Sequence, residues 1–159
     1  MDDGVNMVAH VEGVVIVRGD ADAVPVPMVL GAGSAVALIW PGMGAQYRSM
    51  HRVALEKGAS SIVLRHESDA VYYVVKGAAE FVDLDAGQAT SCDAGSAVHI
   101  DAGTAYAFRA PSGASTVVGG ACPADLRLYP AADSDIKSSG ATGASTEGEN
   151  DGNPARASG

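Results

Sequence analysis

Three histidines lie in or beside short apolar segments of this sequence and could do chemistry together: His51, His66 and His99. Alternate side chains of an extended strand share a face, so His66 points with Leu64, and His51 points with Val53. The same rule leaves the direction of His99 open. Three imidazoles on one face could bind a metal ion, and equally one of them could transfer a proton near neutral pH with the others as polar helpers.

The segments that carry these histidines are typical of β-strands. Runs of β-branched and aromatic residues alternate with turns rich in Gly, Ser and Asp, which favours a sandwich or a barrel. The predicted strands are residues 6–17, 24–30, 34–40, 50–55, 61–66, 70–75, 80–84, 97–100, 105–108 and 115–118. The run at 70–75 is apolar at every position, so we expect it to be covered on both faces. The predicted fold class is all-β.

The composition divides the 159 residues into three parts. Residues 1–45 are predicted to be N-terminal strands that pack on the barrel or on a dimer partner, and residues 46–130 to be the barrel itself. Residues 131–159 are acidic and rich in Gly, Ser and Ala. Such a segment buries too little apolar surface to offset its chain entropy, so we expect a disordered tail.

The net charge, the apolar segments and the cysteine positions exclude several classes of function. A net charge of −9 argues against nucleic acid and anionic membrane surfaces, which select positive faces. The start lacks a secretory signal, and no apolar stretch is long enough to cross a bilayer. Cys92 and Cys122 form neither a disulfide framework nor a zinc knuckle. These features indicate a cytoplasmic protein with reduced thiols.

Two glycine-bracketed motifs resemble those of the cupin superfamily. The first resembles G-x5-H-x-H-x3–4-E-x6-G and runs from Gly58 to Gly77, and the second resembles G-x5-P-x-G-x2-H-x3-N and runs from Gly95 through Gly103 to Ala110. Seventeen residues separate the two motifs. The resemblance implies a cupin-type double-stranded β-helix, or jelly-roll, barrel.

Most of the positions that hold the metal in cupins carry other residues in this chain. The four positions are occupied by Leu64, His66, Ala70 and Tyr106. Leucine and alanine have no donor atom, and one imidazole with a neutral phenol is a poor ligand set for a divalent ion. We therefore expect no cofactor. A rearranged metal site for Fe, Mn, Ni or Zn would have to use His66, His51 and His99.

The resemblance also places the candidate site residues around the barrel cavity. His66, Tyr106 and His51 are the predicted catalytic groups, with His66 as general base or acid and Tyr106 as a donor to a developing oxyanion. The predicted substrate-binding residues are Leu64, Ala70, Tyr72, Phe108, Trp40 and His99. The predicted ligand is a small organic substrate, because no basic side chain points inward to hold phosphate.

Three functions are compatible with this pattern. The first is a metal-independent isomerase, cyclase or lyase of bacterial natural-product metabolism, an expectation drawn from small single-domain cupins. The second is a non-catalytic, degenerate cupin that binds a ligand, and the third is a dioxygenase-like enzyme with a rearranged metal site. Cupins usually pair through N-terminal strands, so the resemblance also implies a homodimer, with the valine-rich segment at 8–17 at the interface.

Overall fold

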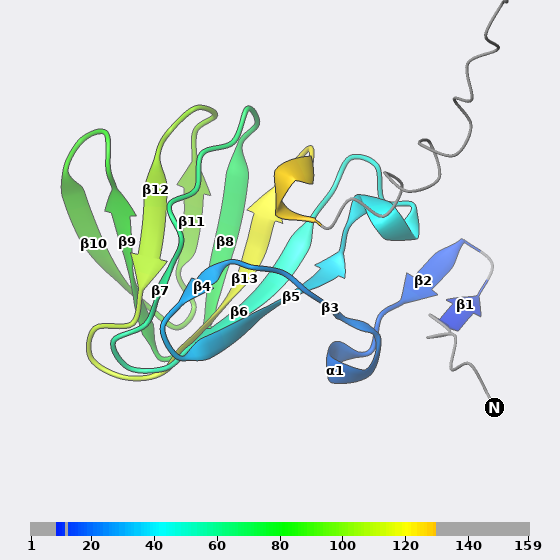
Figure 1. Cartoon of the computed structure of the whole chain (residues 1–159), viewed down its shortest axis with the longest axis horizontal. Helices are drawn as coiled ribbons and strands as arrows, with labels where there is room; N and C mark the ends of the chain where they lie inside the picture. The colour runs from blue at the N-terminus through cyan, green and yellow to red at the C-terminus, as the bar shows by residue number, and fades with distance from the viewer. Residues whose placement is uncertain (1–8, 12, 130–159) are drawn as a thin grey trace, which may run out of the picture.

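Two antiparallel sheets face each other in the computed structural model, which describes residues 9–11 and 13–129 (Figure 1). The six-stranded sheet has the order β11 (Ala97–Ile100), β8 (Ala70–Lys76), β13 (Ser115–Ala121), β6 (Met50–Leu55), β5 (Gly33–Ile39) and β3 (Val24–Pro25). The five-stranded sheet has the order β10 (Gln88–Asp93), β9 (Ala78–Asp83), β12 (Tyr106–Arg109), β7 (Ser60–Ser61) and β4 (Val29–Leu30). The predicted all-β jelly-roll class is confirmed.

Short helical turns connect the strands. They are α1 (Gly19–Asp22), η1 (Pro41–Met43) and η2 (Leu126–Leu128). Among the described residues, no helix has the length and apolar character needed to span a membrane. The segment before residue 46 also supplies strands to both sheets, because β3 and β5 belong to one sheet and β4 to the other.

Side-chain alternation decides what faces the interior. On β6, His51 is buried together with Val53 and Leu55, and on β8 the buried residues are Ala70, Tyr72 and Val74, as the pattern predicts. The expectation that the run at 70–75 is covered on both faces is wrong for the single chain. On the outer face, Val71, Tyr73 and Val75 are 53%, 47% and 49% exposed, because no element of the described chain covers that side of the sheet.

Aromatic side chains fill the space between the sheets. Tyr72 contacts Phe81, Tyr106 and Phe108 at ring-centroid distances of 5.8, 5.8 and 5.2 Å, and Phe81 lies 5.2 Å from Phe108. Tilted and edge-on contacts at these distances are favourable for aromatic pairs. The centre of the barrel is therefore a packed core that ends in two phenol groups.

Three strand predictions for the two sheets need correction. The predicted strand at 24–30 divides into β3 and β4, which belong to different sheets. The stretch predicted as a strand at 61–66 contributes only Ser61, at the end of β7, and one isolated bridge between Leu64 and Tyr106, because the chain leaves the sheet there. The strand β10 was not predicted because its sequence, Gln-Ala-Thr-Ser-Cys-Asp, is polar. It lies at the edge of the five-stranded sheet, where both faces of a strand meet solvent.

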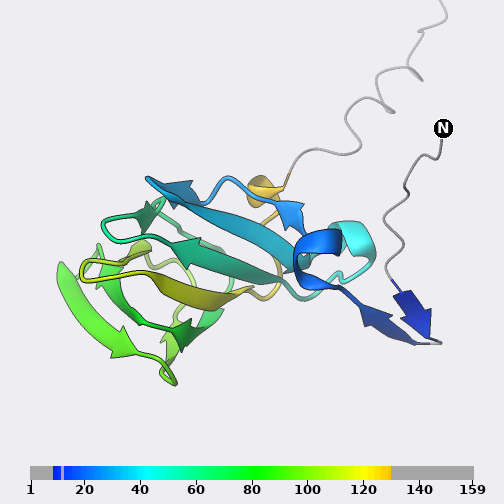
Figure 2. The same ribbon diagram turned by 90° about the horizontal axis from the view of Figure 1, so that it is seen from below.

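The N-terminal hairpin extends away from the two sheets (Figures 1 and 2). It is formed by β1 (Ala9–Val11) and β2 (Val14–Ile16), which pair antiparallel, where the sequence predicted one continuous strand over 6–17. Gly13 joins them with a φ of 79°, a conformation that favours glycine. The β2 side chains are all exposed. The predicted tail at 131–159 lies outside the described residues.

Residues 122–129, which we call the closing segment, follow β13 and cross one end of the barrel, where η2 lies in Figure 1. The Cys122 amide donates to the Asp69 carbonyl, and the Ser68 hydroxyl donates to the Pro123 carbonyl over 2.7 Å. These bonds fasten the segment to the loop that carries His66.

Candidate functional site

The loop between β7 and β8 places His66 inside the end of the barrel. The Leu64 amide donates to the Tyr106 carbonyl and the Tyr106 amide donates back, so this loop is tied to the start of β12. The Gly103 amide donates to the His66 carbonyl. Gly103 has a φ of 83°, a conformation that favours glycine at this motif position. Backbone pairing thus brings His66 and Tyr106 together although forty positions separate them.

A chain of hydrogen bonds runs through the site from the closing segment to the core. The Asp125 carboxylate lies 2.8 Å from His66 Nδ1, and His66 Nε2 lies 2.8 Å from the Tyr106 hydroxyl. The Tyr106 hydroxyl lies 2.7 Å from that of Tyr72. His66, Tyr72 and Tyr106 are all buried. We refer to Asp125, His66, Tyr106 and Tyr72 as the polar chain.

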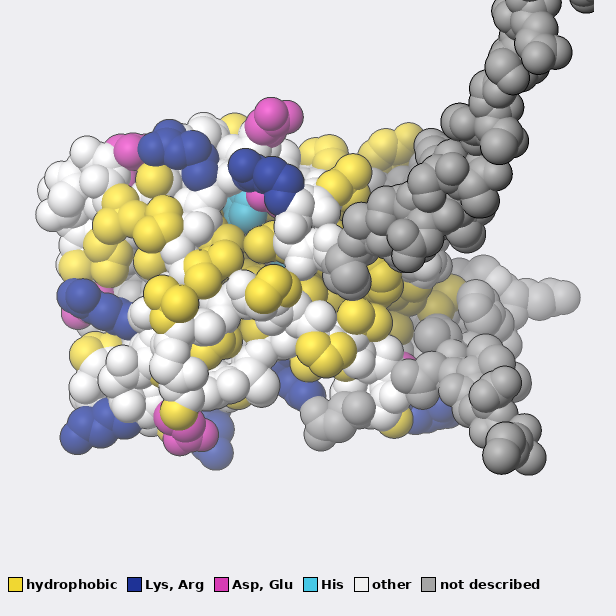
Figure 3. Space-filling view, in the orientation of Figure 1, with side chains coloured by type: hydrophobic (Ala, Val, Ile, Leu, Met, Phe, Trp, Pro, Cys, Tyr) yellow, Lys and Arg dark blue, Asp and Glu magenta, His cyan; other side chains and the backbone are white. Residues whose placement is uncertain are grey.

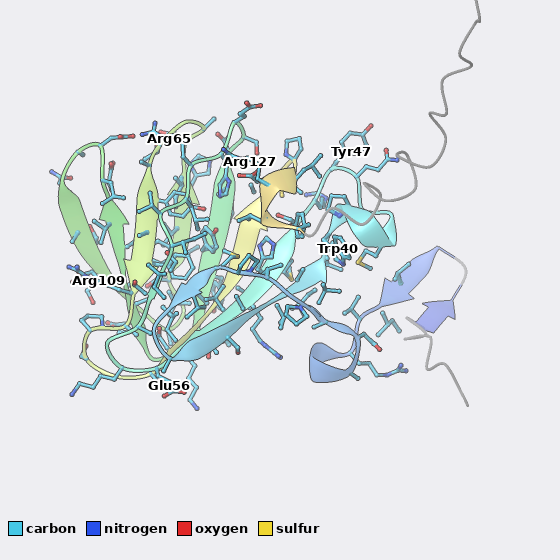
Figure 4. The ribbon with its side chains drawn as sticks, in the orientation of Figure 1. Trp40, Tyr47, Glu56, Arg65, Arg109 and Arg127 are labelled. Carbon is cyan, nitrogen blue, oxygen red and sulfur yellow. The ribbon has the colours of Figure 1, made fainter. Side chains whose placement is uncertain are left out.

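Arg127 keeps one end of the polar chain charged. Its guanidinium forms an ion pair with Asp125 at 2.7 Å and donates to the Arg65 carbonyl over 2.6 Å. Hydrogen bonding to Arg127, with a further contribution from His66, lowers the pKa of Asp125 well below its usual range. Asp125 is therefore an anion and only accepts hydrogen bonds. Figure 4 shows Arg65 and Arg127 at the same end of the barrel.

The two phenols at the other end of the polar chain are neutral. Burial raises the pKa of Tyr106 above its usual range, and the neighbouring Tyr72 adds to the effect. Burial likewise raises the pKa of Tyr72. Both groups are therefore hydroxyl donors at neutral pH.

The charge of Asp125 fixes one hydrogen-bond direction in the polar chain, and a neutral His66 fixes the others. Because the Asp125 carboxylate only accepts, Nδ1 of His66 must carry a proton. A neutral imidazole then has a lone pair on Nε2, which accepts the Tyr106 proton, and the Tyr106 oxygen accepts the Tyr72 proton. The arrangement can take a proton at Tyr106 and move another onto His66, where Asp125 stabilises the resulting cation.

His51 belongs to a separate buried group. Its Nε2 atom lies 2.8 Å from the Tyr129 hydroxyl, and the Tyr129 ring stacks on both His51 and Trp40. Burial lowers the pKa of His51 to about 4, so the imidazole is neutral. Its Nδ1 atom has no hydrogen-bond partner among the described residues. The structure thus places Trp40 and His51 in packing against the closing segment.

His99 lies on the outer side of the barrel, away from the two buried imidazoles. Its side chain is 57% exposed, and its two ring nitrogens lie 3.5 Å from the carboxylates of Asp69 and Asp101. Asp69, His99 and Asp101 are the single group of the described chain whose donor atoms lie close enough to share an ion, and all three are exposed. The structure does not bring His51, His66 and His99 together.

The residues at the metal positions of cupins do not fit a metal ion. Leu64 and Ala70 are buried and offer no donor atom. Both ring nitrogens of His66 are already hydrogen-bonded, one to Asp125 and the other to Tyr106. The donor set at this place is one imidazole and one neutral phenol, which suits proton transfer better than ion binding.

Two cavities flank the polar chain. One has a volume of about 530 Å³ and is lined by His66, Glu67, Ser68 and residues 123–127 of the closing segment. Figure 3 shows a histidine between basic side chains at this end. The other has a volume of about 470 Å³ and is lined by Tyr106, Phe81, His99 and ten further residues of strands β9 to β12 and their loops. Neither of these two cavities is lined by the predicted binding residues Leu64, Ala70, Tyr72, Phe108 and Trp40. Tyr72 instead contributes to the lining of a third cavity, of about 310 Å³, together with Val71, Tyr73 and Gly119.

Sequence reasoning missed Asp125, Arg127 and Tyr129. They follow the last strand, in a stretch that matches neither cupin motif. The one signal is the alternation of apolar Leu126, Leu128 and Tyr129 with charged residues, which is unusual for a solvated loop.

The fold and the site define a small jelly-roll barrel whose interior is closed by a hydrogen-bonded imidazole and two phenols. Residues 51–118 match the Cupin domain family, and the fold is that of cupin-like proteins. No curated protein matches the sequence.

Solved structures share this fold at low sequence identity. An RmlC-like cupin from Shewanella frigidimarina is 18% identical with a TM-score of 0.58, and the match covers 77% of this chain and 100% of that one. A cupin-like protein from Thermotoga maritima is 19% identical with a TM-score of 0.54, covering 65% and 76%. The polyketide cyclase RemF from Streptomyces resistomycificus is 20% identical with a TM-score of 0.55, covering 75% and 81%.

Proposed function

We propose that this protein is a metal-independent enzyme that transfers protons on a small organic substrate, in an isomerase, cyclase or lyase type of reaction. The observation that carries the proposal is the polar chain. In it, an ionised carboxylate orients a buried imidazole whose Nε2 atom is hydrogen-bonded to a phenol at the edge of a cavity. A general base held in this way by a third group is a recurring catalytic arrangement.

The proposed step moves two protons in concert. Tyr106 Oη takes a proton from an activated C–H group of the substrate, while the phenol proton passes to His66 Nε2. The substrate keeps the electron pair of the broken C–H bond as an enolate, and no free phenolate forms, in line with the raised pKa of Tyr106. Return of the proton to another atom gives an isomer, loss of a β-leaving group gives elimination, and attack of the enolate on a second carbonyl gives a ring.

The fold neighbours support the proposal only in general terms. RemF is described as a polyketide cyclase, which is one of the reaction types proposed for this chain. At 20% identity that likeness concerns the fold alone, so the chemistry rests on the side chains of this protein. A role in bacterial natural-product metabolism and a cytoplasmic location are part of the same proposal.

A non-catalytic ligand-binding protein is the second candidate. Its support is the aromatic packing of Tyr72, Phe81, Tyr106 and Phe108, which leaves the centre of the barrel without space for a substrate. In that case the polar chain would only satisfy buried donors and acceptors. Such a protein would bind a ligand without exchanging its protons.

Deuterium exchange separates the two candidates. The probe is 2-tetralone, a neutral aromatic ketone with acidic C–H groups, incubated with the protein in D₂O and followed by proton NMR. We expect the wild-type protein to exceed the buffer rate, and both His66→Gln and Tyr106→Phe to lower the enzymatic rate by about 10²-fold or more. Tyr47→Phe, at an exposed tyrosine, is the matched control and should keep the rate. A wild-type rate equal to that of buffer, or unchanged rates in both site variants, would support the binding protein instead.

We further propose that two copies of this chain form a homodimer. The outer face of the six-stranded sheet presents a row of half-exposed apolar side chains, Val71, Tyr73 and Val75, and the N-terminal hairpin, which lies beyond the β3 edge of that sheet, exposes Val14 and Ile16 (Figure 1). Burying such surfaces against a second copy would remove them from water. Light scattering after size exclusion should give twice the chain mass, and a monomer mass would contradict the proposal.

A further inference from the structure

The cavity beside Tyr106 is open to solvent where the edges of the two sheets separate. Its lining comes from β9, β10, β11 and the start of β12, and β10 has five exposed residues out of six. The buried part of the lining is apolar or aromatic and consists of Phe81, Ile100 and Tyr106. The remaining lining residues include hydrogen-bonding groups such as Gln88 and Thr104. An apolar floor with polar groups around it is typical of a site for a small organic molecule.

The charges around this cavity are negative. Asp83 and Asp101 belong to its lining, and no Lys or Arg does among the described residues. The nearest basic residues along the adjoining strands and loops are already paired, Arg65 with Asp85 and Arg109 with Glu80. The remaining titratable lining groups are His99, which is held by two carboxylates, Cys92 and the neutral phenol of Tyr106. An anionic ligand would therefore enter against repulsion.

We infer that this cavity is the substrate site and that it selects neutral or cationic ring compounds over anionic ones. The inference rests on the proposed function, because Tyr106 is the residue that joins the cavity to His66. The cavity on the other side of His66 has Arg127 in its lining and lies at the closing segment. The polar chain thus connects a negatively charged binding cavity with a second opening, near His66, through which its proton can be exchanged with water.

Three probes that differ in charge but share one ring test the inference. They are benzylamine, benzyl alcohol and benzoate, titrated into ¹⁵N-labelled wild-type protein and followed through amide chemical shifts. We expect shifts at Phe81, Val98, Ile100 and Tyr106 with the amine and the alcohol. Asp83 is half-buried and the Asp101 side chain is 88% exposed, so the two carboxylates together contribute at most about 1 kcal/mol. Benzylamine should therefore bind up to about five-fold more tightly than benzoate at low salt. Equal or tighter binding of benzoate, shifts confined to 123–127, or no shifts with any probe would overturn the inference.

Variants of the two carboxylates separate this inference from the proposed function. The double variant Asp83→Asn and Asp101→Asn should reduce the preference for benzylamine to less than two-fold. Asp93→Asn, at an aspartate of β10 outside the lining, should leave it unchanged. Tyr106→Phe should abolish deuterium exchange on 2-tetralone but keep the charge preference. A charge preference that persists in the Asp83→Asn and Asp101→Asn double variant would sink the site assignment, and persistence of exchange in Tyr106→Phe would sink the catalytic proposal.

Discussion

His66 has a defined role because each of its ring nitrogens faces a different kind of group. The Asp125 carboxylate fixes the proton on Nδ1, and the Tyr106 hydroxyl occupies the lone pair on Nε2. His51, although equally buried, has one hydroxyl partner and no carboxylate. The two imidazoles therefore differ in what they can do, and this difference depends on residues that come from the closing segment.

The two phenols should differ in their contribution to stability. Tyr106 shares hydrogen bonds with both His66 and Tyr72, so Tyr106→Phe leaves two buried polar groups without a partner. We expect a loss of about 1–3 kcal/mol in the free energy of unfolding. Tyr72→Phe removes a hydroxyl with one described partner and should cost about 0.5–1.5 kcal/mol. Urea denaturation of the three proteins measures the difference, and equal losses would contradict the assignment of two hydrogen bonds to Tyr106 and one to Tyr72.

Burial of neutral His51 should make the protein less stable in mild acid. Its pKa is about 4 in the folded state and about 6.5 in the unfolded chain, so the unfolded state binds more protons between these values. The free energy of unfolding should therefore fall as pH decreases from about 6.5 to 4, by up to about 3 kcal/mol, and this term should level off below pH 4. In His51→Leu, the fall in the free energy of unfolding between about pH 6.5 and 4 should be smaller by that amount. An unchanged slope would show that His51 is not the group responsible.

The closing segment is the element on which the site depends. Asp125 attaches it to His66, so Asp125→Ala leaves the His66 Nδ1 proton without an acceptor and removes the ion pair of Arg127. We expect faster hydrogen exchange at the amides of 122–129, with little change on β8, because local opening does not require global unfolding. Asp125→Asn keeps an acceptor oxygen, so it should accelerate hydrogen exchange at these amides less than Asp125→Ala does. Uniform acceleration over the whole barrel would contradict the idea of a separately opening segment.

The strands were predictable to the extent that their side chains alternate. Residues 50–55 and 97–100 are strands with the predicted bounds, because buried and exposed positions follow one another regularly there. Residues 88–93 were missed because an edge strand needs no apolar face. The motif glycines located His66 and Tyr106. Asp125 could not be predicted, since it meets His66 only through a contact between residues fifty-nine positions apart.

At the scale of the whole molecule, the proposed homodimer depends on the exposed face of the six-stranded sheet. Tyr73→Glu places a charge in the centre of the row formed with Val71 and Val75. Because a buried charge without a partner is costly, this variant should be monomeric and should keep its thermal stability at high dilution. Val63→Glu, at an exposed valine outside the six-stranded sheet, is the matched control and should stay dimeric. Dimers of unchanged affinity in Tyr73→Glu would place the interface elsewhere.

Protonation of His66 can be measured without knowing the substrate. Nitrogen NMR of histidine-labelled protein at neutral pH, with His66→Gln to assign the signals, reports which ring nitrogen carries the proton. The account predicts a neutral imidazole protonated on Nδ1, with Nε2 as a hydrogen-bonded lone pair that loses its partner in Tyr106→Phe. A proton on Nε2 in the neutral ring would mean that the lone pair does not face Tyr106, and the proposed proton transfer would then be wrong.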